Sequence, residues 1–458
     1  MCGVAGVFGD EKAVTLCCEA LFAQQHRGQD SCGLASCSKD GLVRHRGMGL
    51  VRDVLSPDVL ASLAGTSAIG HVRYPTQGAA TLENAQPHLF LEDGRPRFAL
   101  ASNGDITNLT ALRAMLAERG VALQGTNDAE VIAACIGVWA FADGLGLEEA
   151  IREWMRQGRG AYSTLLLTPD RLYAFRDPHG FRPLSLGERE GAVLLASETV
   201  AFDVLRGTFL EEIPPGALYR WDAGGLARLQ GASPCGPHHC IFEHIYFARP
   251  DSRAFSERIF EVRRRIGEEL ANGDPVEADV VVPIPDSSNY IGLAYAHAKG
   301  LPFALGLVRN HYIGRSFISP DQVMRDDAVR LKFNPLPGFF EGRRVVLVDD
   351  SIVRGTTIRK LVRMMRENGA REVHLRIGSP PIRFSCYYGI DTPVRERLAA
   401  AFRSPEEVAK SLGADSLRYL PMEGLRCAVS SPDHYCYACF TGDYPEGCKA
   451  EGDTVSGG

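Results

Sequence analysis

The stretch Val345-Val-Leu-Val-Asp-Asp-Ser-Ile-Val-Arg-Gly-Thr-Thr357 decides the fold of the second half of the chain. It begins with a continuous apolar run, Val345 to Val348, which is typical of a strand buried on both faces of a parallel sheet. Apolar residues then recur at the spacing of one helix face: Ile358, Leu361, Val362 and Met365. A second apolar run, Ala278 to Pro283, also precedes helical sequence. The pattern predicts an α/β domain with a parallel sheet.

The loop between this strand and helix has the composition of a phosphate-binding site. A loop that enters a helix N-terminus presents free N–H groups and the positive end of the helix dipole. Gly355 allows close approach of the backbone, and hydroxyl donors come from Ser351, Thr356 and Thr357. No Gly-Lys-Ser/Thr follows, so the loop is not a Walker A motif. Asp349 and Asp350 suit sugar hydroxyls or a hard cation such as Mg²⁺; the alternative is a solvated acidic turn.

The first half of the chain has a different pattern. As far as about Trp221, short strand-like runs alternate with Gly- and Pro-rich turns, and a few helices interrupt them, such as Leu109 to Gly120. A length of 458 residues agrees with two or three domains. The loop-like stretch Gly231 to Pro237 separates the halves. We therefore expect domains at 2–230 and 240–445, followed by a tail at 446–458.

Composition excludes several classes of protein. A chain with 45% hydrophobic and 23% charged residues is ordinary for a globular protein. It has no apolar run near ~18 residues and no secretory signal, so we expect a cytoplasmic protein without membrane contact. The net charge of -6 argues against nucleic acid as the main partner. Thirteen cysteines, an odd number without an export signal, favour reduced, metal-ligating or catalytic thiols over disulfides.

Cys2 is a candidate nucleophile. Because Cys2 is small, we expect Met1 to be removed, which leaves an α-amine with a pKa near ~7.7–8.0. Such an amine acts as general base for its own side chain in N-terminal-nucleophile enzymes. The alternative is an accidental cysteine at this position.

Five motifs around and after Cys2 resemble, in their order, the glutaminase domain of class II amidotransferases. They are Cys2-Gly3-Val-Ala-Gly-Val-Phe8, His26-Arg-Gly-Gln-Asp30, Gly70-His-Val-Arg-Tyr-Pro-Thr76, Ser102-Asn-Gly-Asp105 and Thr126-Asn-Asp-Ala-Glu130. The resemblance implies an α+β N-terminal-nucleophile fold of αββα type, with Cys2 as the nucleophile.

The same resemblance gives four further residues a role. Arg73 offers a planar fork for the α-carboxylate of glutamine, and Asp128 pairs with its α-ammonium. Asn103 and the N–H of Gly104 form an oxyanion hole. Each has a plainer alternative: Arg73 in a surface ion pair, Asn103-Gly104 in a hairpin turn, and Asp128 as a helix cap.

The stretch Val345 to Thr357 resembles the phosphoribosyl pyrophosphate (PRPP) signature of type I phosphoribosyltransferases. Together with the glutaminase motifs and the linking stretches Arg176 to Pro183, Phe242 to Ser252 and Cys436 to Pro445, it resembles the glutamine PRPP amidotransferase family over nearly the whole chain. The family's reaction converts PRPP, glutamine and water to 5-phosphoribosylamine, glutamate and pyrophosphate. The resemblance implies that ammonia passes between two sites through an internal channel, and that Mg²⁺ accompanies the pyrophosphate.

The resemblance also implies the PRPP-binding residues. They are Asp286, Ser287, Lys332, Asp349, Asp350, Ser351, Arg354, Gly355, Thr356 and Thr357. Of these, Ser287, Asp349 and Asp350 lie around Mg²⁺. A loop that closes over PRPP is expected within Tyr312 to Pro335, with Arg315, Arg330 and Lys332; the alternative is a plain surface loop. The chain departs from the family at Ser288-Asn-Tyr290 and at His311.

Four cysteines form a candidate metal site away from this chemistry. The pair Cys436-x-x-Cys439 indicates a metal, and Cys240 and Cys386 complete a set of four thiolates. From spacing alone, Zn²⁺ and an iron–sulfur cluster both fit, and four free thiols are the alternative. The resemblance to the iron–sulfur branch of the family implies a structural [4Fe–4S] cluster. Cys235 competes with Cys240, which directly precedes the Ile-Phe-Glu motif.

Two rival functions remain at this stage. One is another class II amidotransferase, such as a hexosamine-phosphate synthase, against which the PRPP signature counts. The other is a non-catalytic regulator that binds PRPP or nucleotides. Its only support is the departure from the family at Ser288 to Tyr290 and at His311. The resemblance further implies feedback inhibition by purine nucleotides and a homo-oligomer, either a dimer or a tetramer.

Overall fold

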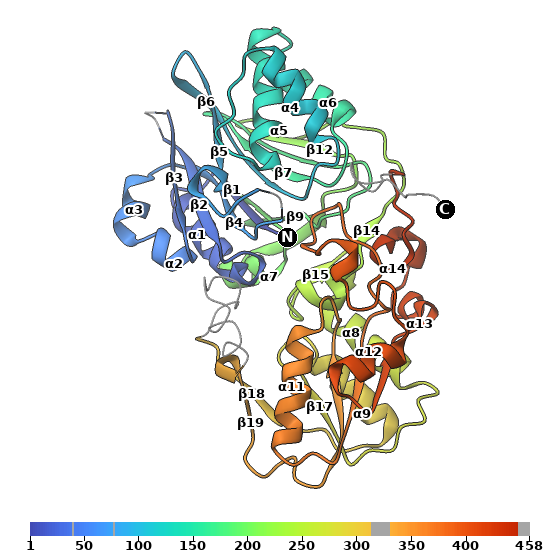
Figure 1. Ribbon diagram of the computed structural model, residues 1–458. Coiled ribbons are helices and arrows are strands. Elements are labelled where there is room, and N and C mark those ends of the chain that lie inside the picture. The colour runs from blue at the N-terminus through green and yellow to red at the C-terminus, as the bar shows by residue number, and fades with distance from the viewer. Residues whose placement is uncertain (39–40, 77, 313–329, 448–458) are drawn as a thin grey trace.

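The computed structural model describes residues 1–38, 41–76, 78–312 and 330–447. The first half of the chain forms two stacked antiparallel sheets, and the second half forms a smaller parallel sheet (Figure 1). Among the described residues, none of the helices combines the length and the apolar character that a membrane crossing requires.

The first sheet of the amino-terminal domain has seven strands. In spatial order they are β11 (Thr208–Glu212), β9 (Ser185–Arg189), β10 (Ala192–Ala196), β1 (Gly3–Phe8), β4 (Ser67–Arg73), β2 (Ser31–Ser38) and β3 (Gly41–Met48). The predicted strand at Ala68 to Arg73 lies in β4. The strand that follows Cys2 therefore lies in the middle of a sheet, paired on both sides.

The second sheet has six strands. In spatial order they are β13 (Gly225–Leu229), β12 (Leu218–Asp222), β8 (Leu172–Arg176), β7 (Ser163–Leu167), β6 (Arg95–Asn103) and β5 (His88–Glu92). Apolar side chains from both sheets meet between them, for example Ile69 and Leu165. Sheet packing of this kind buries one face of each sheet.

Helices cover the two outer faces. The first sheet packs on α1 (Ala13–Ala23), α2 (Val51–Val54), α3 (Pro57–Ser62) and α7 (Val200–Leu205). The second packs on α4 (Leu109–Glu118), α5 (Asp128–Gly137) and α6 (Leu147–Gln157). The result is the four-layer αββα order that was predicted, visible in the upper part of Figure 1.

The second domain is built on a four-stranded parallel sheet. Its order is β17 (Val280–Pro283), β20 (Arg344–Asp349), β21 (Glu372–Ile377) and β22 (Ser416–Tyr419). In β20, Val346 and Val348 face one core and Val345 and Leu347 face the other. Alternate side chains of a strand point to opposite faces, so the continuous apolar run reflects burial on both sides, as predicted.

Helices again cover both faces of this sheet. One core includes residues of α8 (Ile259–Ala271), α9 (Asn289–Lys299) and α13 (Met422–Cys427), and the other includes α11 (Thr356–Glu367) and α12 (Pro405–Leu412). Short elements complete the domain: β14 (His239–Cys240), β15 (Arg253–Ala254), β16 (Glu257–Arg258), β18 (Leu307–Arg309), β19 (Phe333–Pro335), β23 (Tyr435–Cys436) and α14 (Ala438–Thr441). The α/β class with a parallel sheet is confirmed.

A buried ion network joins the two domains beside Cys2. The Arg27 guanidinium, fully buried, donates to the carboxylates of Glu198 and Glu243, with a distance of 2.7 Å to Glu243 Oε1. Glu243 opens a short helical turn of the second domain, Glu243–Phe247. Arg27 Nε also donates to the backbone oxygen of Cys2 at 2.9 Å. One side chain therefore contacts the candidate nucleophile and both domains.

Arg27→Met should destabilise the protein strongly, because it leaves two buried carboxylates without their cation. Removal of one partner of a buried pair costs about 3–5 kcal/mol. Urea unfolding measures this loss. Arg264→Met is the matched control, because its partners Glu261 and Glu268 lie with it at the surface, where a pair is worth about 1 kcal/mol or less. Equal losses in both variants would contradict the assigned role of the network.

Candidate active sites

Cys2 lies in a closed site at the start of β1. Cys2 is 8% exposed. Its backbone N–H donates to Asn103 Oδ1 at 3.0 Å, and its Sγ lies 3.5 Å from the backbone oxygen of Tyr74. Burial raises the pKa of the Cys2 thiol, although the N-terminal amine and Arg73 oppose the shift. The thiol therefore needs a nearby base, and the α-amine is a candidate once Met1 is removed.

Asn103 and Gly104 stand at the end of β6, next to Cys2. The side-chain nitrogen of Asn103, Nδ2, is buried and has no hydrogen-bond partner in the described part of the chain. Gly104 has φ +140, and a Cβ at this position would lie 2.0 Å from the backbone oxygen of Ala161. The turn therefore requires glycine. An unpaired buried donor costs free energy, and a developing oxyanion would satisfy it.

Arg73 and Asp128 come from other elements of the same domain. Arg73 ends β4, and its Nη1 donates to Asp30 Oδ2 at 3.3 Å and to the backbone oxygen of Ala79 at 3.0 Å. Asp128 is the first residue of α5, whose N-cap is Asn127. Burial, and next the charge of Asp105, raise the pKa of Asp128 to about 7. The plainer alternatives do not describe these residues fully. Arg73 pairs with Asp30 but is buried, so it is not in a surface ion pair. Asn127, and not Asp128, caps the helix.

A segment of the second domain completes the wall of this site. The backbone oxygen of Tyr388 accepts a hydrogen bond from Arg182 Nε at 2.8 Å, and Tyr74 Oη donates to Asp391 Oδ2 at 3.3 Å. A Cβ on Gly389 would lie 3.3 Å from Gly104 Cα. No sequence pattern indicated this contact, because the segment is remote in the chain and lies next to Cys386.

The acidic pair lies where β20 ends, at the carboxyl edge of the parallel sheet, which is where ligands bind in such folds. Ser287 Oγ donates to Asp350 Oδ2 at 2.5 Å, and Ser288 Oγ donates to Asp349 Oδ1 at 3.1 Å. Burial raises the pKa of both carboxyls, and the charge of Asp350 adds to the shift at Asp349. Ser288, a departure from the family, is therefore part of this cluster.

The predicted phosphate loop runs from Ser351 into the N-terminus of α11. Gly355 has φ +75 and is the N-cap, and Thr356 is the first helical residue. Ser351 Oγ donates to Asp350 Oδ1 at 2.6 Å. Lys332 lies near enough to Asp349 for its charge to oppose the rise in the carboxyl pKa. The amides of the first turn of an α-helix have no acceptor within the helix, so those of α11 are suited to bind an anion.

Two other predicted residues of this site form ion pairs of their own. Asp286 is half exposed and pairs with Arg309 at 2.7 Å, and Arg330 pairs with Glu367 at 2.9 Å. The predicted closing loop, including Arg315, falls mostly outside the described residues. β18, which precedes this loop, pairs antiparallel with β19, which ends it.

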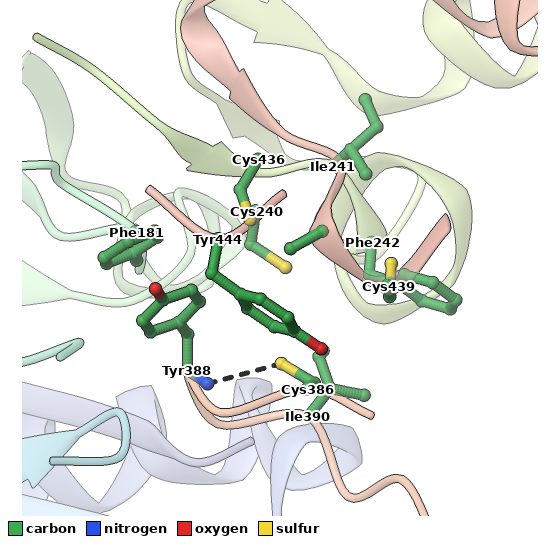
Figure 2. Close-up of a pocket in the computed structure, with 11 residues that line it drawn as sticks. Phe181, Cys240, Ile241, Phe242, Cys386, Tyr388, Ile390, Cys436, Cys439 and Tyr444 are labelled. Carbon is green, nitrogen blue, oxygen red and sulfur yellow. Dashed lines mark hydrogen bonds between the residues drawn. The ribbon is translucent and has the colours of Figure 1, made fainter. Parts of the chain in front are cut away.

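The four predicted cysteines come together. Cys240, Cys386, Cys436 and Cys439 line one small cavity with a volume of about 20 Å³, whose other walls include Phe181, Tyr388 and Tyr444 (Figure 2). Cys235 does not line it and is exposed. The described cysteines are all free of disulfides. Within the described ranges, no group of three His, Cys, Asp or Glu side chains is placed to hold a single metal ion.

Comparison with known protein families agrees with both halves. Residues 76–204 match the family described as a glutamine amidotransferase domain. Residues 255–377 match the family described as a phosphoribosyl transferase domain. The fold and the two sites together define a glutamine-dependent phosphoribosyltransferase.

Whole-chain relatives make the assignment specific. "Amidophosphoribosyltransferase, chloroplastic" of Glycine max is 47% identical over 448 residues, 97% of this chain and 78% of the relative. The Bacillus subtilis amidophosphoribosyltransferase is 41% identical over 449 residues, 97% of this chain and 94% of the relative. The solved glutamine PRPP amidotransferase from B. subtilis, complexed with ADP and GMP, superposes with a TM-score of 0.90 at 41% identity, covering 97% of both chains.

The chain belongs to the amidophosphoribosyltransferase family. It is an enzyme that converts PRPP, glutamine and water to 5-phosphoribosylamine, glutamate and pyrophosphate, the first step of de novo purine synthesis. The rival interpretations, a hexosamine-phosphate synthase and a non-catalytic regulator, are thereby set aside.

Asn103→Ala should lower kcat for glutamine hydrolysis by about 10²–10³, the usual loss of one oxyanion donor. KM for glutamine should change much less, because the donor acts on the intermediate. Steady-state glutamate release measures both constants. A raised KM with an unchanged kcat would instead place Asn103 in ground-state binding.

Proposed function

We propose that the reaction is divided between residues 2–230, which release ammonia from glutamine, and residues 240–445, which bind PRPP, with 446–458 as a tail. The observation that carries this proposal is the hydrogen bond from the Cys2 N–H to Asn103 Oδ1, beside a buried Asn103 Nδ2 that has no hydrogen-bond partner among the described residues. Arg73 binds the α-carboxylate of glutamine and Asp128 its α-ammonium. These contacts orient the substrate amide toward the thiol.

The residues around Cys2 suit acyl transfer. The Cys2 sulfur attacks the amide carbon, the thiol proton passes to the α-amine, and the oxyanion is held by Asn103 Nδ2 and the Gly104 N–H. The C–N bond then breaks and the proton leaves with ammonia, which leaves a thioester on Cys2. Water hydrolyses this thioester to glutamate and restores the thiol.

The second site suits displacement of pyrophosphate at the ribose C1. Asp349 and Asp350 accept hydrogen bonds from the ribose hydroxyls, and the loop from Ser351 to Thr357 binds the 5′-phosphate. The donor set of Ser287, Asp349 and Asp350 consists of oxygens only, which fits Mg²⁺. That ion would neutralise charge on the pyrophosphate. Ammonia arrives through an internal channel, and its nitrogen forms the new bond to C1 as pyrophosphate leaves.

The remaining predicted PRPP ligands share in this site. We propose that three further residues bind the phosphates of PRPP, either directly or by positioning other phosphate-binding residues: Asp286, Lys332 and Arg354. Of these, Lys332 has support from its electrostatic effect on Asp349.

Cys2→Ala should abolish glutamine-dependent synthesis of phosphoribosylamine and keep synthesis from free ammonia, because only the ammonia source is lost. Asp350→Asn should damage synthesis from either nitrogen source. Pyrophosphate release with glutamine or with ammonium chloride measures both activities. Loss of ammonia-dependent synthesis in Cys2→Ala, or a fully active Asp350→Asn, would contradict the division.

We further propose that the four cysteines hold a structural [4Fe–4S] cluster. The donors are all sulfur, as such clusters require, and the walls are apolar and aromatic. Burial raises the pKa of Cys240 to about 11, while the nearby Arg182 opposes this shift. Metal binding needs thiolates, and the positive charge of Arg182 favours them.

Protein purified without oxygen should contain iron and sulfide in equal amounts and no zinc. Cys436→Ser should lower the iron content, because a ligand is lost, whereas Cys235→Ser is the matched control and should keep it. Elemental and sulfide analysis gives the answer without an activity assay. Stoichiometric zinc, or iron retained in Cys436→Ser, would refute the cluster.

Regulation and assembly are proposed on the relatives. The B. subtilis structure is a complex with ADP and GMP, so we propose purine nucleotides as feedback inhibitors of this enzyme. We also propose a homo-oligomer, a dimer or tetramer, and a cytoplasmic location; plant relatives are named as chloroplastic.

A further inference from the structure

A second buried carboxylate, Asp105, lies beside the candidate glutamine site and has no role in the chemistry above. It follows Gly104 directly and is 5% exposed. Its backbone oxygen accepts from the Ala161 N–H at 2.9 Å, and its Oδ1 accepts from Thr76 Oγ1 at 2.6 Å. Backbone and side chain are therefore both fixed in place.

Asp105 and Asp128 form one acidic site. The N–H of Ile106, the residue after Asp105, donates to Asp128 Oδ2 at 3.2 Å. The two carboxyls are close enough for the charge of Asp105 to raise the pKa of Asp128. In the part of the chain that the structure describes, neither carboxylate has an ion-pair partner. The charges of the N-terminal amine and of Arg182 oppose the rise that burial causes in the pKa of Asp105, without forming an ion pair with it. Two neighbouring buried carboxylates without a directly paired cation are unfavourable, so the site is suited to a further positively charged group.

The charged groups around the Cys2 thiol indicate which cation binds at the Asp105–Asp128 site. Arg73 acts electrostatically on the Cys2 thiol and so does Asp105, with the opposite sign. The surroundings of the thiol thus include one cation, Arg73, and one carboxylate, Asp105, next to which Asp128 lies. A free amino acid in its zwitterionic form carries the complementary pair of charges.

We propose that Asp105 is a specificity-determining residue that binds the α-ammonium of glutamine together with Asp128. This inference rests on the proposed glutaminase function. Asp128 also accepts N–H groups at the start of α5, which occupies part of its hydrogen-bonding capacity. Asp105 supplies the further acceptor that an ammonium, with three donors, requires.

The test uses Asp105→Asn, which keeps an oxygen for Thr76 and removes only the charge. Two constants are measured: KM for glutamine hydrolysis, and the inhibition constant of glutaramate, which is glutamine without its α-amino group. KM for glutamine should rise about tenfold to a hundredfold, the loss of one charged hydrogen bond. The inhibition constant of glutaramate should stay the same or fall.

Each outcome either supports or overturns the binding of the α-ammonium by Asp105. Equal weakening of glutamine and glutaramate would show that Asp105 only shapes the site or acts on the Cys2 amine, and would overturn the proposal, as would an unchanged KM. Asp58→Asn, which changes an exposed carboxylate of the same domain, is the matched control and should alter neither constant. Ammonia-dependent synthesis should be normal in all variants.

A second variant covers a failure of Asp105→Asn to fold. Thr76→Val removes the hydrogen bond that orients Asp105 but keeps its charge, so it should raise KM for glutamine about fivefold to tenfold without weakening glutaramate. Equal weakening of both compounds would again overturn the role of Asp105. If wild-type protein released no glutamate at all, the proposed glutaminase function itself would fail, which is a distinct result.

Discussion

The structure depends on the burial of one guanidinium between two carboxylates. Burial alone would lower the pKa of Arg27, but the charges of Glu243 and Glu198 raise it above its usual value. Glu198 is also held by Arg249 N–H and by Ser252 Oγ, each at 2.9 Å. A buried ion pair of this kind is stable only when its remaining hydrogen bonds are satisfied, and here both domains supply them.

This network also links the two candidate sites. Arg263 on α8 is buried and donates to the backbone oxygens of His244 and Ala248 at 2.8 Å. Burial lowers the pKa of Arg263 to about 10, while the charges of Asp350 and Glu198 oppose that shift. A series of buried charges therefore extends from the acidic pair of the second domain to the backbone of Cys2. Low-dielectric surroundings make such charges sensitive to one another.

The sequence was sufficient for the fold and for the local parts of each site. The apolar run at Val345 to Val348 predicted the parallel-sheet domain, because such a run arises from burial of the strand on both faces. The αββα fold of the first half was predicted from the resemblance of its motifs to class II amidotransferases. The helix after the phosphate loop ends as expected, with Gly369 at φ +85. The same resemblance implied that Asn103 lies at the Cys2 site, and the Cys2 N–H donates to Asn103 Oδ1 in the structure.

Contacts between distant segments were not predictable from these patterns. Arg27 lies inside a recognised motif, yet its partners are 171 and 216 residues away along the chain. Arg182 reaches Tyr388 across 206 residues. From sequence, Ser288 was only a departure from the family pattern, whereas in the structure its hydroxyl donates to Asp349 Oδ1 at 3.1 Å. No local spacing encodes such contacts, since they exist only after both domains have packed.

The meeting of Gly389 with Gly104 sets a limit on how this enzyme can evolve. Each glycine comes from a different domain, and a side chain on Gly389 would press on the backbone of Gly104 and on Arg182, with its Cβ 3.3 and 3.1 Å from them. A domain from an unrelated enzyme could therefore replace either half only if it left the same space at the contact between Gly389 and Gly104. The two domains are therefore sterically coupled at this contact, although each has a core of its own.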